Sequence, residues 1–338
     1  MREARRMASR ALIFVAALLV DAGCGGSKGA DPAAASSCAP GGPGLTDCGS
    51  AKENCCTSPV VVGGTYERTY TNDGTGPTAQ ADPATVSSFR LDTYAVTVGR
   101  FRQFVAAWNA GWRPAAGSGR HSHLNGGQGL ANVGPGGGYE SGWQTADSAN
   151  VAPTDDSLTC DPKYSTWTPA ASTRENHPMN CVNWWEAMAF CIWDHGFLPS
   201  EAEWEYAAAG GDQQREYPWG TTDPGSASQY AIYTCDYPTG NPAMCSNDVS
   251  NIAPVGTAAL GAGRWTQVDL GGNVWQWVLD SQSAYVACTD CAYLTEALPV
   301  VRGGSFNLDV ATLVPPLRDS YSPDVRDYII GFRCARSP

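Results

Sequence analysis

The sequence predicts a single α+β domain that is rich in loops and has few, short helices and strands. Charged residues make up only 16% of the 338 residues, whereas 38 residues are glycine and 23 are proline. This composition disfavours both a helical bundle and an acidic disordered chain. The 12 tryptophans and 14 tyrosines supply ample aromatic surface for a core. A few short segments with helix caps or alternating polarity then predict the regular elements.

The clearest helix lies in the stretch Phe197–Gly220. Ser200 and Glu203 have the spacing of a capping box, in which two side chains bond backbone N–H groups at a helix start. Gly210 supplies the exit, because a residue without Cβ readily adopts a left-handed conformation. We therefore expect a short helix between Ser200 and Gly210 that leads into the turn YPWG.

Two further helices are expected on similar grounds. Asn183 and Glu186 repeat the capping-box spacing, and Gly196 is expected to close that helix. Thr97 can cap another helix, because apolar residues recur after it at helical spacing: Val98, Phe101, Val105 and Trp108.

Alternating polarity predicts strands over Val60–Tyr70 and Phe89–Thr97. The later segment Ala115–Pro169 has no period and is long for a loop in a compact domain, and such loops are usually functional or partly disordered. We interpret His121 and His123 as surface histidines of this loop, because no third metal ligand is visible nearby.

The first 23 residues are interpreted as a signal peptide, because a basic start precedes the apolar run Ala11–Val20. Ten residues are too few to span a bilayer as a helix, for which about 20 are needed. The segment ends in Ala-Gly-Cys24, which resembles a bacterial lipoprotein cleavage box. Cys24 is therefore the expected lipid-attachment site, with a plain secretory signal as the alternative. In both cases we expect export to the bacterial cell envelope, in the periplasm or on the outer surface.

Residues 24–59 are predicted to form a flexible tether that carries cysteines. Its low apolar content prevents folding around a core of its own, so disulfides must supply whatever order it has. Cys55 and Cys56 could belong to a metal site or a redox pair, but an oxidising compartment favours a small disulfide knot with Cys38 and Cys48. The folded domain is then expected to span residues 60–338.

Without Cys24 the chain has 12 cysteines, an even number that suits disulfides in an exported protein. Cys235 and Cys245 are expected to pair locally. Cys288 and Cys291 form a CxxC, which could indicate redox chemistry or half a zinc site. Because no second matched pair accompanies it, a structural disulfide, or pairing elsewhere, is favoured.

Four motifs occur in order along the chain: FLPSEAEWEYAAAGG with YPWG, DLGGNVWQW at Asp269–Trp277, VRGGSF at Val301–Phe306, and IGFRCAR at Ile330–Arg336. Together they closely resemble the formylglycine-generating enzyme, or sulfatase-modifying factor, family. The resemblance covers roughly Val60 to the C-terminus and implies a C-type-lectin-like fold. It also implies a disulfide between Cys191 and Cys334, worth about 4–5 kcal/mol on the chain-entropy view. His177 resembles the family's structural His-Pro dipeptide, so we interpret it as a packing histidine.

The resemblance further implies a structural calcium site in the second motif. Its ligands would be the matching positions Asp269, Gly272, Val274 and Gln276, all sources of the hard oxygen atoms that Ca²⁺ prefers. The family commonly has Glu where this chain has Gln276, so one negative charge is lost. Without the resemblance, a glycine-rich turn with buried tryptophans would be the default interpretation.

The active family places two cysteines shortly after GGS[FY], in a pattern close to GGSFxCxxxxC. They hold Cu(I) and oxidise a substrate cysteine to formylglycine with oxygen, and soft thiolates suit this metal. Here Leu308 and Leu313 stand at or near those positions, and no cysteine occurs between Cys291 and Cys334. Copper is therefore not expected.

Ser305 and Trp275 still match residues that line the family's pocket, and Arg318 fits its C-terminal frame. We therefore expect a non-catalytic envelope protein that binds a ligand or a protein partner through this pocket. The alternative is an oxidoreductase of the formylglycine-generating type that acts on a protein cysteine through a non-standard site.

Several other functions lack residue support. The net charge of −12 disfavours nucleic acid and anionic membrane as partners, so membrane contact is expected only through the N-terminal lipid. Iron-dependent sulfoxide synthases on this scaffold need three clustered histidines, and the four scattered histidines do not offer them. GxSxG, P-loop and HExxH motifs are missing from the sequence.

Overall fold

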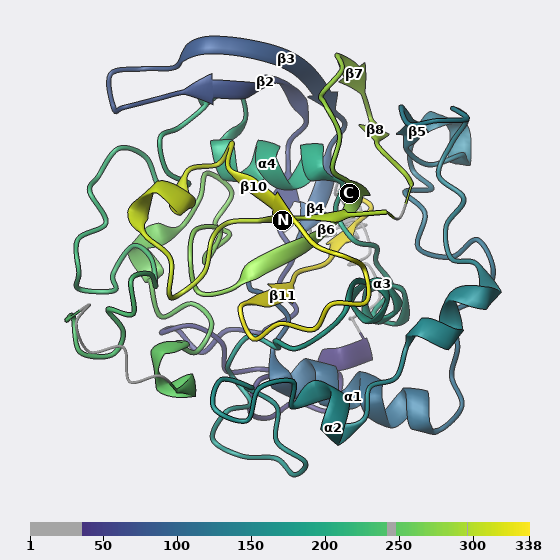
Figure 1. The fold of residues 1–338 in the computed structure, drawn as a ribbon, viewed down its shortest axis with the longest axis vertical. Coiled ribbons are helices and arrows are strands. Elements are labelled where there is room, and N and C mark those ends of the chain that lie inside the picture. The colour runs from purple at the N-terminus through teal and green to yellow at the C-terminus, as the bar shows by residue number, and fades with distance from the viewer. Residues whose placement is uncertain (1–35, 242–247, 296) are drawn as a thin grey trace, which may run out of the picture. The chain divides into compact units, whose positions relative to one another are not determined.

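In the computed structural model of the chain, short helices and several small sheets make up the fold (Figure 1). This architecture confirms the α+β prediction. The structure describes residues 36–241, 248–295 and 297–338. The predicted signal peptide 1–23, the lipid-attachment residue Cys24 and the predicted disulfide partner Cys245 lie outside the described residues. Within the described ranges, no helix has the length and apolar character needed to cross a membrane.

The regular elements are all short. The α-helices are α1 (Val98–Asn109), α2 (Asp155–Leu158), α3 (Trp184–Trp193) and α4 (Glu201–Ala209). The strands are β1 (Val60–Val61), β2 (Gly64–Thr71), β3 (Thr78–Val86), β4 (Phe89–Leu91), β5 (Ala131–Asn132), β6 (Trp275–Ser281), β7 (Cys288–Thr289), β8 (Cys291–Ala292), β9 (Pro299–Arg302), β10 (Arg318–Ser320), β11 (Ile330–Phe332) and β12 (Ala335–Arg336).

Three helices begin where the sequence predicts. The side chains of Thr97, Asn183 and Ser200 each accept a hydrogen bond from the backbone N–H three residues later, and the last two complete capping boxes. Helix α4 also ends as predicted, at left-handed Gly210. The end of α3 differs from the prediction.

Helix α3 ends at Trp193, and the left-handed residue after it is His195, with φ at 61°, rather than Gly196. Gly196 is needed for a different reason, because a Cβ there would come within 2.4 Å of the carbonyl oxygen of Ala335. The glycine therefore permits a close backbone approach to the C-terminal strand.

The central sheet has the strand order β10-β9-β6-β11, with β11 parallel to β6 and the other pairs antiparallel. All seven residues of β6 are buried, and their side chains alternate between two cores. Trp275, Trp277 and Leu279 pack with residues of α1 and α3, whereas Val278 packs with residues of α4. In Figure 1, α3 and α4 accordingly lie on opposite sides of β6.

The two predicted strands are shorter than expected. Val60–Tyr70 forms β1 and most of β2, with a break between them. Of the predicted strand Phe89–Thr97, Phe89–Leu91 forms β4 between β1 and β12, and Thr97 forms an isolated bridge with Pro178. The residue after β4, Asp92, accepts a hydrogen bond on its carboxylate from the buried guanidinium of Arg100 in α1.

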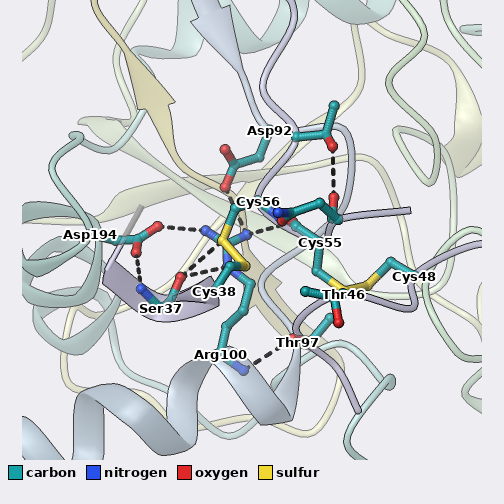
Figure 2. The surroundings of a disulfide bond; sticks show 12 residues. Ser37, Cys38, Thr46, Cys48, Cys55, Cys56, Asp92, Thr97, Arg100 and Asp194 are labelled. Atoms are coloured by element: carbon teal, nitrogen blue, oxygen red, sulfur yellow. Dashed lines mark hydrogen bonds and ion pairs between the residues drawn. A yellow bond between two sulfur atoms is a disulfide. The ribbon is translucent and has the colours of Figure 1, made fainter. Parts of the chain in front are cut away.

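Residues 36–59, here called the N-terminal disulfide segment, pack against the rest of the domain. Disulfides join Cys38 to Cys56 and Cys48 to Cys55, so the predicted knot is present. The guanidinium of Arg100 donates to the Ser37 hydroxyl at 3.1 Å and to the Cys55 carbonyl at 3.2 Å (Figure 2). These described residues are therefore an ordered part of the fold, whereas the sequence predicted a flexible tether.

The other described cysteines are also in disulfides. The pair Cys191–Cys334, implied by the family resemblance, is confirmed and links α3 to the segment before β12. Cys288–Cys291 is confirmed as a local disulfide. The pair Cys160–Cys181 was not expected from any sequence pattern.

Candidate functional site

Leu308 and Leu313, which stand where the family's thiolates are expected, serve apolar packing. Leu308 is partly buried and packs against the core formed with α1 and α3. Leu313, 1% exposed, belongs to a separate cluster with Ala231 and Tyr233. The two side chains therefore support different clusters, and neither offers a ligand to a soft metal.

The three predicted pocket residues do not form one polar group. Ser305 is fully buried and its hydroxyl donates to Asn307 Oδ1 at 2.7 Å. Trp275 is 3% exposed and packs within the core. Arg318 instead contacts Glu201, with Nη1 at 3.2 Å from Oε2. Ser305 and Trp275 therefore contribute almost no exposed surface, and Arg318 belongs to a different cluster.

That second cluster is a buried ionic network centred on Arg302. Its guanidinium donates to Glu201 at 2.6 Å and to Glu205 at 2.9 Å, and all three side chains are at most 4% exposed. Arg318 lies over the ring of Tyr285, 4.1 Å from its centroid. This network was not predicted from the sequence, although Glu201 and Glu205 stand one helical turn apart and this spacing is a sign of a shared partner.

Burial perturbs the acids of this network. It raises the pKa of Glu205 to about 8, although Arg302 opposes the rise, and it raises the pKa of Asp280 to about 7, with Glu201 adding to the rise. Such values suit acid–base chemistry near neutral pH. However, the cavity beside Glu201 and Asp280 measures only about 10 Å³, which holds about one water molecule. The network therefore has no room for a substrate.

Of the predicted calcium ligands, Gln276 is fully engaged in hydrogen bonds with the protein. Gln276 Oε1 accepts from Trp204 Nε1 at 2.8 Å and from Arg333 Nε at 2.6 Å, which uses both of its lone pairs. Gln276 Nε2 donates to the carbonyl oxygen of Asp269 at 2.7 Å. Gly272 has φ at 85°, and a Cβ there would lie 2.3 Å from the carbonyl oxygen of Ile232. Its role in this turn is thus close backbone packing.

Arg333 places a permanent positive charge among these residues. Its fully buried guanidinium donates to the backbone carbonyl oxygens of Asp92, Thr93, Val268 and Asp269. The carboxylate of Asp269 accepts from the N–H of Gly256 on one oxygen, and burial raises its pKa. Asp269 Oδ1 is buried without a hydrogen-bond partner. Gln276 Oε1, in contrast, is fully occupied beside the Arg333 guanidinium, so Gln276 does not fit a calcium ion, and no role is assigned to calcium.

His121 forms a buried bridge between two glutamates, so its prediction as a surface residue was wrong. Nδ1 lies 3.0 Å from Glu140 Oε2 and Nε2 lies 3.0 Å from Glu203 Oε2. Burial lowers the pKa of His121, but the two carboxylates outweigh it and raise the value to about 10. The imidazole is therefore protonated at neutral pH, and its two N–H groups donate to Glu140 and Glu203.

His123 is only partly buried, and burial lowers its pKa. Burial also lowers the pKa of His177, to about 4, with Arg174 adding to the effect. The pKa of His121 is thus raised, whereas those of His123 and His177 are lowered. In residues 36–241, 248–295 and 297–338, three or more His, Cys, Asp or Glu side chains nowhere gather in a geometry that could hold a metal ion.

None of the described cysteines offers a free thiol. Ten form the five disulfides named above, and Cys235 is disulfide-bonded as well. Cys288 and Cys291, the pair that could have supplied thiolates from elsewhere in the sequence, are joined to each other. A Cu(I) site of two thiolates is therefore missing from the part of the chain that the structure describes.

Comparison with known proteins supports the family resemblance that the four sequence motifs indicated. The family described as sulfatase-modifying factor enzyme 1-like domain matches residues 46–338. The formylglycine-generating enzyme of Thermomonospora curvata is 27% identical, over 82% of this chain and 90% of that protein. The inactive C-alpha-formylglycine-generating enzyme 2 of Bos taurus is 31% identical, over 49% of this chain and 53% of that protein.

The structure of PvdO from Pseudomonas aeruginosa superposes with a TM-score of 0.55 at 20% identity, over 88% of this chain and all of that one. A likeness at this identity concerns the fold alone. The match of the family over residues 46–338 includes all four sequence motifs. This chain therefore belongs to the sulfatase-modifying factor enzyme 1-like family.

Proposed function

We propose that this protein is a non-catalytic member of the family that binds a ligand or a protein partner in the bacterial cell envelope. The observation that carries the proposal is the pairing of every described cysteine in a disulfide, combined with leucine at positions 308 and 313. Copper-dependent oxidation needs thiolates to hold the metal. The described residues keep the scaffold of the family and lack this reagent.

Export and lipid attachment are part of the proposal. The basic and apolar start of the sequence and the Ala-Gly-Cys24 segment support them. The five disulfides add support, because disulfides persist in oxidising compartments and are rare in the cytosol. Palmitate labelling of the expressed chain with Cys24→Ala as the control tests this part.

A Cu(I) titration against a competing chelator tests the loss of copper binding. The wild-type chain, with its disulfides intact by thiol count, is expected to bind no Cu(I) in competition with the chelator. The double variant Leu308→Cys/Leu313→Cys is the comparison, because Cu(I) that it binds beyond the wild type shows that the assay detects thiolate ligands. One equivalent of tightly bound Cu(I) in the wild-type chain contradicts the proposal.

A further inference from the structure

A cavity of about 250 Å³ lies between α3, the end of β6 and the loop around Glu140. The side chains of Trp184, Met188, Leu279 and Leu294 give it an apolar wall, and Glu140, Asn132 and Ser141 contribute polar atoms. The cavity is separate from Ser305, Leu308 and Leu313, none of which lines it. Its composition, apolar with a few polar groups, is typical of small-molecule sites.

Glu140 is the one charged residue among those that line the cavity, and it is only 4% exposed. Its Oε2 accepts from the backbone N–H groups of His121 at 3.0 Å and Leu130 at 3.3 Å, and it also contacts the His121 ring. Its Oε1 has a single longer contact, 3.2 Å from His121 Nδ1. Oε1 therefore keeps an acceptor position for a further donor.

The charge around Glu140 is negative in sum. His121 carries one positive charge between the carboxylates of Glu140 and Glu203, so the bridge has a net charge of −1. Glu203 is occupied at the start of α4, where it accepts from the N–H of Ser200 at 2.8 Å. None of the described residues that line the cavity is Lys or Arg. Glu140 is therefore the member of this negatively charged bridge that lines the cavity.

We propose that this cavity binds a small organic monocation with an apolar body, such as an arylalkylamine. The ammonium group donates to Glu140 Oε1, since hydrogen bonds between charged partners are the stronger ones. The apolar body packs against Trp184, Met188 and Leu294 and leaves water, which is favourable. A volume of about 250 Å³ lies just below the range of roughly 300–1,000 Å³ typical of drug-sized ligands, so a smaller ligand of roughly ten non-hydrogen atoms fits.

This inference deepens the proposed function, on which it rests, by naming the site and the chemical class of the ligand. The test is isothermal titration calorimetry of the full chain with three probes of similar body: phenethylamine, 2-phenylethanol and phenylacetate. Phenethylamine is expected to bind at least about tenfold more tightly than the alcohol, equivalent to about 1.4 kcal/mol. Phenylacetate is expected to bind more weakly than both, because its carboxylate faces Glu140. Equal affinity for amine and alcohol, or no heat from the amine at millimolar concentration, overturns the inference.

Variants locate the site. Glu140→Gln and Leu294→Trp are each expected to weaken phenethylamine at least about tenfold, the first by removing the charge and the second by filling the cavity. Asp156→Asn, which removes an exposed carboxylate in α2, is the charge-matched control and is expected to change nothing. If Glu140→Gln fails to fold, Leu294→Trp and the neutral alcohol still decide the result. Unchanged affinity in a folded Leu294→Trp variant overturns the inference.

The two proposals fail separately. Bound Cu(I) in the wild-type chain contradicts the non-catalytic function and leaves the amine titration to stand by itself. Absence of amine binding removes this inference and leaves the copper result untouched.

Discussion

Replacing Arg100 by methionine is expected to lower the free energy of unfolding by roughly 3–5 kcal/mol, because it leaves two buried carboxylates with a single cation between them. Arg100 contacts Asp92 at 2.9 Å and Asp194 at 2.7 Å, and all three side chains are fully buried. Arg336 also contacts both aspartates and would be their one remaining cation among the described residues. At the size of this domain the melting temperature is expected to fall by on the order of 10 °C.

The same variant is expected to loosen the N-terminal disulfide segment. Arg100 is a shared donor to Ser37 and Cys55, while Ser37 N–H donates to Asp194 (Figure 2). Hydrogen exchange is expected to rise first in residues 36–59, because the segment loses two hydrogen bonds to α1.

Arg102→Met is the matched control. Arg102 lies on the same helix and pairs with Glu175, but its side chain is 19% exposed. Because water still reaches part of this pair, Arg102→Met is expected to lose clearly less stability than Arg100→Met in chemical unfolding. Equal effects of the Arg100 and Arg102 changes would show that the buried network is not what anchors the segment.

The variant His121→Gln is expected to remove a pH-dependent part of the stability. The pKa of His121 is raised from 6.5 to about 10 in the folded protein, because Glu140 and Glu203 outweigh burial. A base whose pKa is higher in the folded protein than in the unfolded chain stabilises the fold. This stabilisation is complete at pH values below the pKa of the unfolded chain and is lost as the pH rises through the pKa of the folded protein. The stabilisation is therefore present at pH 6 and declines to nothing above about pH 10, by on the order of 4 kcal/mol in total.

Urea unfolding followed by tryptophan fluorescence at pH values from 6 to about 10 measures this dependence. Glu205 and Asp280 have pKa values raised to about 8 and about 7, so they also titrate in this window. The difference between wild type and His121→Gln isolates the histidine, and it is expected to shrink as pH rises. His123→Gln is the control, because burial shifts the pKa of His123 downward, in the direction opposite to that of His121. A difference that does not vary with pH would mean that His121 is uncharged in the bridge.

Local features of the fold followed from the sequence, because the interacting residues are neighbours. The capping boxes Ser200–Glu203 and Asn183–Glu186 join residues three apart. The disulfide Cys191–Cys334, across 143 residues, could be predicted only through the family resemblance.

The features that the sequence did not predict depend on contacts between residues far apart in the chain. His121 appeared to be a surface residue because its partners Glu140 and Glu203 lie 19 and 82 residues away. Arg318 appeared to belong with Ser305, yet it meets Glu201 across 117 residues. The N-terminal disulfide segment was predicted to be flexible, because a contact that holds it, between Ser37 and Asp194, spans 157 residues and leaves no local sequence pattern. Nothing in the local sequence predicts such pairings, since they depend on how the chain folds back on itself.

The mass of a peptide substrate tests the central claim most directly. A peptide with the Cys-x-Pro-x-Arg pattern is incubated with the copper-treated wild-type chain, oxygen and a reductant too mild to open the disulfides, as checked by thiol count, and its mass is then measured. The account predicts an unchanged peptide, because the described cysteines are in disulfides and leucine occupies positions 308 and 313. Multiple turnovers to a peptide whose cysteine CH₂SH group has become an aldehyde would contradict it.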